Sequence, residues 1–69
     1  IVYPNPTTDF INIKDNKYYN EAKVYDTSAK LVLNQNIKKN KIDVKSLPKG
    51  IYYLELIGKE KAVVKFIKD

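Results

Sequence analysis

Hydrophobic residues in this chain recur mainly at every second position, which is the period of a β-strand rather than that of a helix. Ile11 and Ile13 alternate with polar neighbours, and Ala22 and Val24 do the same. The most apolar run extends over residues 51–57, and no segment sustains a helical stripe. The pattern therefore predicts an all-β chain of six or seven short strands, folded as a small sandwich or barrel.

Polar and turn-forming residues separate the predicted strands. The segment Asp26–Lys30 predicts a tight turn that joins two strands as a hairpin. Residues 34–40 predict a loop, because five of them are Asn34, Asn36, Lys38, Lys39 and Asn40. Residues 41–44 predict either a short strand or the approach to a turn, and we expect Ile42 and Val44 to face the core.

The segment Leu47–Gly50 has the composition of a β-turn, with proline at its second position and glycine at its fourth. Proline presets φ there, and glycine permits a positive φ or a close approach of another backbone. In the strand that follows, successive side chains point to opposite faces. We therefore expect Tyr52, Leu54 and Leu56 to pack in the core and Tyr53 to lie on an outer face.

The chain is short, with 69 residues and neither cysteine nor histidine. A domain of this size buries only about 60% of the surface that its unfolded chain exposes, and no disulfide or zinc site of the usual kind can support it. The core must then be purely hydrophobic or rely on a fused neighbour. Since the sequence does not begin with methionine, we expect residues 1–69 to be a single domain taken from a longer multidomain polypeptide.

The net charge of +5 is distributed unevenly along the chain, and all of its basic residues are lysines. Residues 1–37 hold four lysines and four acidic residues, whereas residues 38–69 hold nine lysines and four acidic residues. A basic surface can attract nucleic acid or anionic lipid, but base and phosphate recognition favours arginine. Lysines along strand edges also protect small sheets from pairing. We predict no nucleic-acid partner, and no apolar run approaches the roughly 20 residues of a transmembrane helix.

Candidates for chemistry are few. Without histidine and cysteine, the commonest general base and the strongest nucleophile are missing. Ser28 and Ser46 lie in turn-like sequence with no base nearby. Asp9, Asp26 and Asp43 could converge on a calcium ion, but single aspartates at strand ends more often cap turns. The sequence predicts no enzyme, no metal site and no cofactor.

Six tyrosines in so short a chain raise a second possibility for function. Exposed tyrosine rings can stack on sugar rings or on unpaired bases. Tyr18 and Tyr19 are adjacent, as are Tyr52 and Tyr53. The alternative hypothesis is therefore a glycan-binding or adhesive β-sandwich module of a secreted protein, which would remain on the mature protein.

Six short motifs follow one another along the whole chain. They are Tyr3-Pro4-Asn5-Pro6, Phe10-Ile11-Asn12-Ile13, Val24-Tyr25-Asp26, Ile42-Asp43-Val44, Leu47 with Gly50 and Tyr52, and Val64-Lys65-Phe66-Ile67-Lys68. In this order they resemble the type A C-terminal sorting domain of the type IX (Por) secretion system. One departure is Ala29, which stands before Lys30 where the family usually has glycine. If that position needs a positive φ, alanine adds strain of about 1 kcal/mol.

The resemblance implies a small Ig-like antiparallel β-sandwich of six to seven short strands that acts as a folded sorting signal. Its cargo would pass from the periplasm through an outer-membrane translocon, with a shuttle protein, to the cell surface or the medium. A sortase-type cysteine protease would cut in a linker upstream of Ile1. Gly50 and Tyr52 would shape the recognised strand. The implied sorting-motif residues are Pro4, Asn5, Pro6, Gly50, Tyr52, Lys65 and Lys68.

Overall fold

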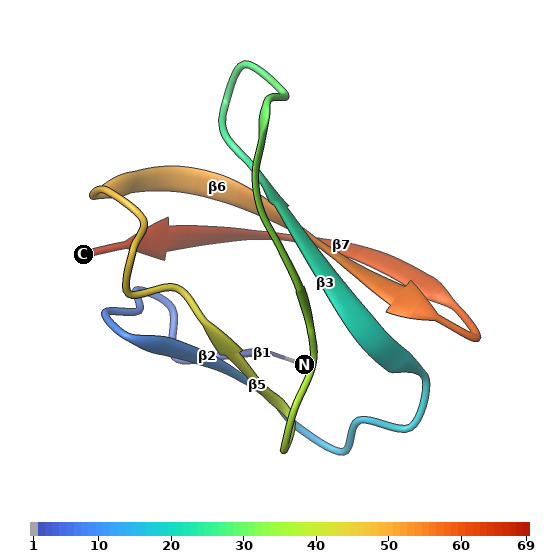
Figure 1. The fold of residues 1–69 in the computed structure, drawn as a ribbon. Helices are drawn as coiled ribbons and strands as arrows, with labels where there is room; N and C mark the ends of the chain where they lie inside the picture. Colours follow the sequence, from blue (N-terminus) through green and yellow to red (C-terminus); the bar gives the residue numbers. More distant parts are fainter. Residues whose placement is uncertain (1) are drawn as a thin grey trace.

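The computed structural model describes residues 2–69, which form seven β-strands in two sheets (Figure 1). The strands are β1 (Val2–Tyr3), β2 (Phe10–Ile13), β3 (Tyr19–Tyr25), β4 (Leu31–Asn36), β5 (Lys41–Asp43), β6 (Gly50–Gly58) and β7 (Lys61–Lys68). All paired strands are antiparallel. The prediction of a small antiparallel β-sandwich of six or seven short strands is confirmed.

The two sheets differ in size and face each other across one core. The smaller sheet has the strand order β1-β2-β5, and the larger has the order β4-β3-β6-β7. Hairpins join β3 to β4 and β6 to β7, whereas β5, which lies between them in the sequence, belongs to the smaller sheet and pairs with β2. The chain therefore passes from one layer to the other and back between β4 and β6 (Figure 1).

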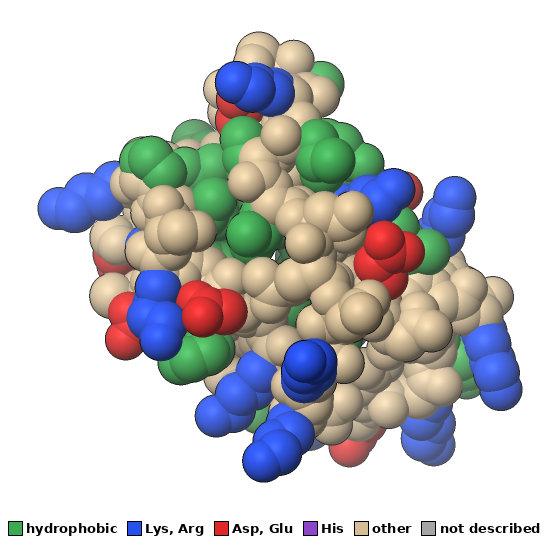
Figure 2. Space-filling view, in the orientation of Figure 1, with side chains coloured by type: hydrophobic (Ala, Val, Ile, Leu, Met, Phe, Trp, Pro, Cys, Tyr) green, Lys and Arg blue, Asp and Glu red, His purple; other side chains and the backbone are tan. Residues whose placement is uncertain are grey.

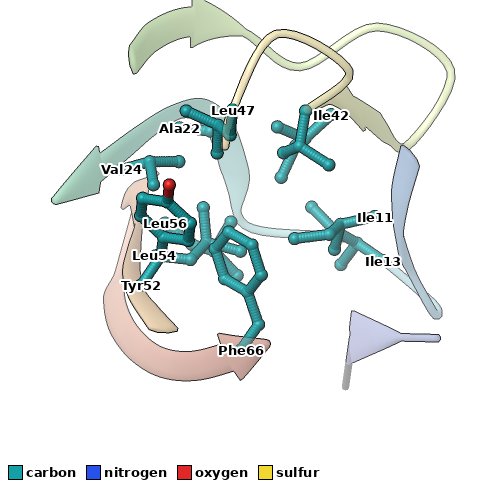
Figure 3. Packing of buried hydrophobic residues seen from close by; sticks show 11 residues of the cluster. Ile11, Ile13, Ala22, Val24, Ile42, Leu47, Tyr52, Leu54, Leu56 and Phe66 are labelled. Atoms are coloured by element: carbon teal, nitrogen blue, oxygen red, sulfur yellow. The ribbon is translucent and has the colours of Figure 1, made fainter. Parts of the chain in front are cut away.

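The core contains the alternating residues that the sequence pattern selected. Figure 3 shows Val24, Leu54 and Phe66 of the larger sheet facing Ile11 and Ile13 across the sandwich. The buried hydrophobic residues are Ile11, Ile13, Ala22, Val24, Ile42, Val44, Leu47, Tyr52, Leu54, Leu56 and Phe66. The prediction that Tyr52 would be buried and Tyr53 exposed is confirmed, because the two side chains leave opposite faces of β6.

The predicted hairpin between residues 26 and 30 is held by one aspartate. The Asp26 carboxylate accepts hydrogen bonds from the Ser28 hydroxyl at 2.7 Å and from the Ser28 and Lys30 backbone N–H groups at 2.9 and 3.0 Å. Ala29 has a φ of 66°, in the left-handed region that favours glycine. The sequence-based expectation of strain at Ala29 is therefore supported by its backbone geometry.

The predicted loop over residues 34–40 is wrong in its first half. Residues 34–36 continue β4, and they pair with residues 21–23 of β3. Asn34 and Asn36 point to solvent while Gln35 faces inward, so the period of two persists although every residue is polar. The prediction was wrong because it took a polar segment to be a loop. A strand at the edge of an antiparallel sheet can be polar where it is exposed to solvent.

Candidate functional site

The N-terminal segment lies beside the end of the last strand. The Thr7 N–H donates to the Ile67 carbonyl at 2.9 Å, and the Asp69 N–H donates to the Thr7 carbonyl at 2.8 Å. These two bonds form a parallel bridge between Thr7 and Lys68. Thr7 is only 1% exposed, and its hydroxyl donates to the Phe10 carbonyl at 2.6 Å. Thr7 therefore fixes the start of the domain to its end.

The side chain of Asn5 extends this pairing by one more step. Its Oδ1 accepts a hydrogen bond from the Ile67 N–H at 2.9 Å, and its Nδ2 donates to the Lys65 carbonyl at 3.3 Å. If residues 5–7 formed a regular parallel strand beside β7, the backbone of Asn5 would bond the Lys65 carbonyl and the Ile67 N–H. Here the side chain of Asn5 bonds these two groups. The amide of Asn5 thus acts as a substitute for a backbone peptide. The residues on either side, Pro4 and Pro6, follow cis peptide bonds and have no N–H of their own.

The side chain of Lys68 is buried beneath this segment, with 7% of its surface exposed. Its ammonium group donates to the Leu47 carbonyl at 2.9 Å. Leu47 itself is a buried core residue, as the sequence predicted. The next-to-last residue of the chain therefore holds the turn that precedes β6.

Tyr52 supports the same turn from its other side. Its hydroxyl donates to the Pro48 carbonyl at 2.7 Å, and its ring stacks on Phe66 with 5.6 Å between the ring centroids. Gly50 has a φ of 158°, which side-chain-bearing residues rarely adopt, and a Cβ there would lie 3.8 Å from the Tyr52 ring. Backbone conformation, rather than lack of space, therefore favours glycine at position 50.

These contacts gather all of the sequence-predicted sorting residues into one region. We call it the C-terminal corner and define it as residues 4–7, 47–52 and 65–69. Within it the side chains of Tyr52 and Lys68 are buried, whereas Lys65, Pro4, Asn5 and Pro6 are exposed. Tyr52 and Lys68 therefore act on the shape of the corner, and the exposed side chains are accessible from solvent.

Two residues of structural importance were missed by sequence reasoning. Thr7 lies outside any alternating pattern, so nothing marked it as buried. Gly58 ends β6 against the backbone of Tyr18, and a Cβ at this position would overlap the Tyr18 carbonyl oxygen. A glycine directly after the apolar run over residues 51–57 was the available signal, but it does not distinguish a turn requirement from a close backbone approach.

A second side-chain amide, on β4 at the opposite edge of the larger sheet, also bonds backbone groups. The Gln35 Oε1 accepts from the Asp43 N–H at 2.9 Å, and its Nε2 donates to the Asp43 carbonyl at 3.0 Å. The amide of Gln35 in β4 thereby bonds the backbone of β5 in the other sheet. Two side-chain amides, those of Asn5 and Gln35, thus bond backbone groups at the two edges of the sandwich.

The outer face of the larger sheet has a shallow apolar hollow of about 390 Å³ between the β3–β4 turn and β7. Tyr25 and Tyr53 are cross-strand partners there. The Tyr25 hydroxyl donates to a Glu55 carboxylate oxygen at 3.0 Å, and this hydrogen bond raises the pKa of Tyr25. On the face drawn in Figure 2, lysine side chains project at several places, some of them side by side near the lower edge.

The three aspartates considered for calcium lie in different settings. Asp26 and Asp43 accept hydrogen bonds from backbone N–H groups of their own turns, as turn-capping aspartates do. Within residues 2–69, no three acidic side chains lie close enough together to hold a metal ion. Over the same residues, the structure has no helix of the length and apolarity needed to cross a bilayer.

The fold and the C-terminal corner define a small β-sandwich domain in which side-chain and backbone contacts hold the last strand in place. The chain belongs to the family described as the secretion system C-terminal sorting domain, which matches residues 1–69. It is accordingly a sorting domain that directs secretion through the Por (type IX) secretion system. The resemblance inferred from the six motifs is confirmed at the level of the family.

A curated relative agrees with this assignment. The chain is 47% identical over 55 residues to β-agarase D of Zobellia galactanivorans. The match covers 80% of this chain but only 11% of the relative. The similarity is therefore to a small part of a much longer protein.

Proposed function

We propose that residues 1–69 are the C-terminal domain of a larger secreted protein and belong to the type A subgroup of sorting domains. The support is the ratio of lengths in the comparison, since the relative is several times longer than the matched segment. The order of motifs from Tyr3 to Lys68 is the reason for choosing type A. The rest of the parent protein would be the cargo, and its activity would be independent of this domain.

In this proposal the domain passes through the periplasm and is recognised there in its folded state. Its partners are the outer-membrane translocon and a shuttle protein, after which the cargo stays on the cell surface or enters the medium. A sortase-type cysteine protease then acts upstream of Ile1, a position outside the described residues. The exposed state of Pro4, Pro6 and Lys65 makes them available for direct contact with a partner.

The observation that carries the proposal is the junction of Asn5 and Thr7 with residues 65–69. It holds two of the predicted motifs, from the two ends of the sequence, as one surface. The buried members of the motif set, Tyr52 and Lys68, would then contribute by fixing this surface rather than by touching a partner.

The test is a fusion of residues 1–69, behind a linker, to a fluorescent protein that carries a periplasmic targeting signal. It is expressed in a type IX-competent bacterium and in a translocon mutant of the same strain. We expect surface or medium fluorescence in the first strain and periplasmic fluorescence in the second. Retention in the periplasm of both strains, with the fusion intact, would refute the proposal.

The glycan-binding alternative has one observation in its favour, the hollow with Tyr25 and Tyr53. A glycan module must remain attached to the mature protein, whereas a sorting signal is commonly removed. Mass determination of the secreted product therefore separates the two. A product that keeps residues 1–69 and loses polysaccharide binding on Tyr53→Ala would support the alternative.

A further inference from the structure

The free edge of β7 is covered over only half of its length. Asn5 and Thr7 bond the outward-facing backbone groups from the Lys65 carbonyl to the Asp69 N–H. Outward groups of an edge strand recur at every second residue, so the same row continues through the Lys65 N–H and the N–H and carbonyl of Val63. In the described part of the chain, β7 has β6 on one side and no further strand on the other. These backbone groups therefore form an open row.

Burial of the inward-facing side chains changes at the same point along β7. Phe66 and Lys68, which lie in the half of β7 whose edge is bonded by Asn5 and Thr7, are buried. Ala62 and Val64 face the same way but are only half-buried. The apolar core thus continues to the open half of the edge without a neighbouring strand to cover it. A strand added beside residues 61–65 would cover this part of the core and satisfy the open backbone groups.

The side chains of β7 that lie on the outer face of the larger sheet give the open row a charge pattern. Lys61 and Lys65 are exposed on either side of Val63, which is 67% exposed. Their neighbours on β6 are Ile57 and Tyr53. Among residues 2–69, neither lysine has a carboxylate oxygen within ion-pairing distance. The row therefore presents an unpaired positive charge, an apolar side chain and a second unpaired positive charge at two-residue spacing.

We propose that this row is a strand-addition site for an extended, acidic segment of a partner protein. Side chains directly opposite each other on neighbouring strands interact, and opposite charges stabilise the pair. The fitting segment has two acidic residues flanking an apolar residue at two-residue spacing, with apolar residues between them toward the core. The proposal rests on the proposed function, because it supplies the chemistry by which a secretion partner reads the C-terminal strand.

The same lysines select against other occupants. A second copy added in register along this row would bring Lys61 and Lys65 close to lysines of its own β7, and the chain as a whole carries +5. Like charges on neighbouring strands are destabilising, and lysine on an edge suppresses indiscriminate pairing. An acidic partner strand is instead attracted by Lys61 and Lys65. The same two lysines therefore disfavour pairing between copies of the chain and favour an acidic partner.

Asn5 sets the limit of the site. Its side chain is exposed and uses only the Ile67 N–H and the Lys65 carbonyl, whereas the adjoining Thr7 is buried and fixed. An incoming strand that extends past Lys65 would have to replace the amide of Asn5 but not Thr7. Removal of the Asn5 side chain should therefore lengthen the open row and strengthen peptide binding.

The direct test is a binding titration of the 69-residue chain with the capped peptide Thr-Glu-Val-Val-Val-Glu-Thr, and with a counterpart that has lysine for glutamate. We expect binding of the acidic peptide alone, weakened by salt. Val63→Pro removes an outward N–H at a position where an edge strand tolerates proline, and binding should fall about tenfold. Val63→Ala keeps the N–H and is the matched control. Lys61→Glu with Lys65→Glu should reverse the preference between the two peptides.

Equal binding of both peptides, no binding to the unaltered chain, or equal effects of Val63→Pro and Val63→Ala would overturn the inference. The secretion fusion described above separates this failure from failure of the proposed function. If the unaltered fusion and the Val63→Ala fusion are secreted but Val63→Pro stays in the periplasm, the row is the sorting contact. If all three are secreted, the proposed function stands and the row is not used in sorting. If none is secreted, the proposed function fails first.

Discussion

The ammonium group of Lys68 donates to the backbone carbonyl of Leu47 at 2.9 Å, although 21 positions separate the two residues. The bond is buried, and it joins the end of β7 to the turn before β6. Lys68 was predicted as a sorting-signal residue, and in the structure its side chain is buried at the edge of the core. Its role can be separated by mutation from that of the exposed Lys65.

Lys68→Met keeps most of the apolar stem of the side chain and removes its charged donor. The Leu47 carbonyl then loses its partner in a buried setting, and we expect the free energy of unfolding to fall by about 1–3 kcal/mol. Lys65→Met is the matched control on an exposed position, where the change should stay within about 0.5 kcal/mol. Urea unfolding followed by circular dichroism measures both. Equal losses for the two variants would contradict a structural role for Lys68.

Asn5→Ala removes the two hydrogen bonds that a side-chain amide makes to β7. Because the site is exposed, we expect a loss of about 0.5–1.5 kcal/mol of stability, and faster hydrogen exchange of the Ile67 N–H. Asn34→Ala, on the solvent-facing side of β4, provides a control that should leave this exchange rate unchanged. Unaltered protection of the Ile67 N–H in Asn5→Ala would show that Thr7 alone closes the edge.

The two glycines should respond differently to the same substitution. Gly58→Ala introduces an overlap with the Tyr18 carbonyl, and overpacking against backbone costs about 1–3 kcal/mol or more. The Cβ of Gly50→Ala would make only ordinary van der Waals contact with the Tyr52 ring. Its cost is the backbone cost of the positive φ, about 1–2 kcal/mol. Thermal unfolding should rank Gly58→Ala as the less stable variant. Gly50→Val should in addition impair secretion of the fusion, and normal secretion at unchanged stability would argue against a role for this turn in sorting.

Ala29→Gly should stabilise the domain. Ala29 has a φ of 66°, and relief of this conformation is worth about 1 kcal/mol. The control is Ala62→Gly in β7, an alanine with no such strain, where glycine should destabilise by about 0.5–1 kcal/mol. Opposite signs in a denaturant titration would verify the assignment, and a loss of stability in both variants would contradict it.

Acid should weaken the β3–β4 hairpin through Asp26. Its pKa lies below the ordinary value of 3.8, first because the Ser28 hydroxyl donates to the carboxylate and then because the Lys30 N–H does. A folded-state pKa below the unfolded one contributes stability above pH 3.8 that is lost as the pH falls through the folded-state value. Melting temperatures measured from neutral pH to about pH 2 should fall less steeply for Asp26→Asn than for the parent chain. Parallel curves would exclude this contribution.

The fold could be predicted from the sequence because the buried residues of the strands are apolar and lie at alternating positions. Ile11, Ile42 and Leu54 are apolar, lie on alternating positions and are fully buried. Alternation fails where a polar strand has no apolar face to mark it, as in residues 34–36, which were predicted as loop. A strand of this kind is specified by its pairing with β3, and no local pattern contains that information.

The candidate site was predictable as a set of residues but not as an arrangement. Pro4, Asn5 and Pro6 were predicted as sorting-motif residues, but the sequence did not show that the side chain of Asn5 bonds the backbone of a strand 60 positions away. Tyr52 was correctly expected in the core, whereas Lys68 was predicted only as a sorting-motif residue and nothing in the sequence marked its side chain as buried. Half of the free edge of β7 is covered by residues 5–7, and the sequence did not indicate this cover either. Such contacts depend on long-range closure of the chain, which spacing along the sequence does not reveal.

The parallel bridge between Thr7 and Lys68 also has a mechanical consequence. The segment before Thr7 and the segment after Lys68 leave the bridge in opposite directions, so a load applied between the two ends pulls along the paired strands. The bonds of Asn5 and Thr7 to β7 are then stretched together in shear instead of opening one after another. A force that pulls on the C-terminal end would therefore pass through the bonds of Asn5 and Thr7 to the N-terminal segment and to any domain fused before it. The packing of Phe66 and the rest of the core would not have to be disturbed first.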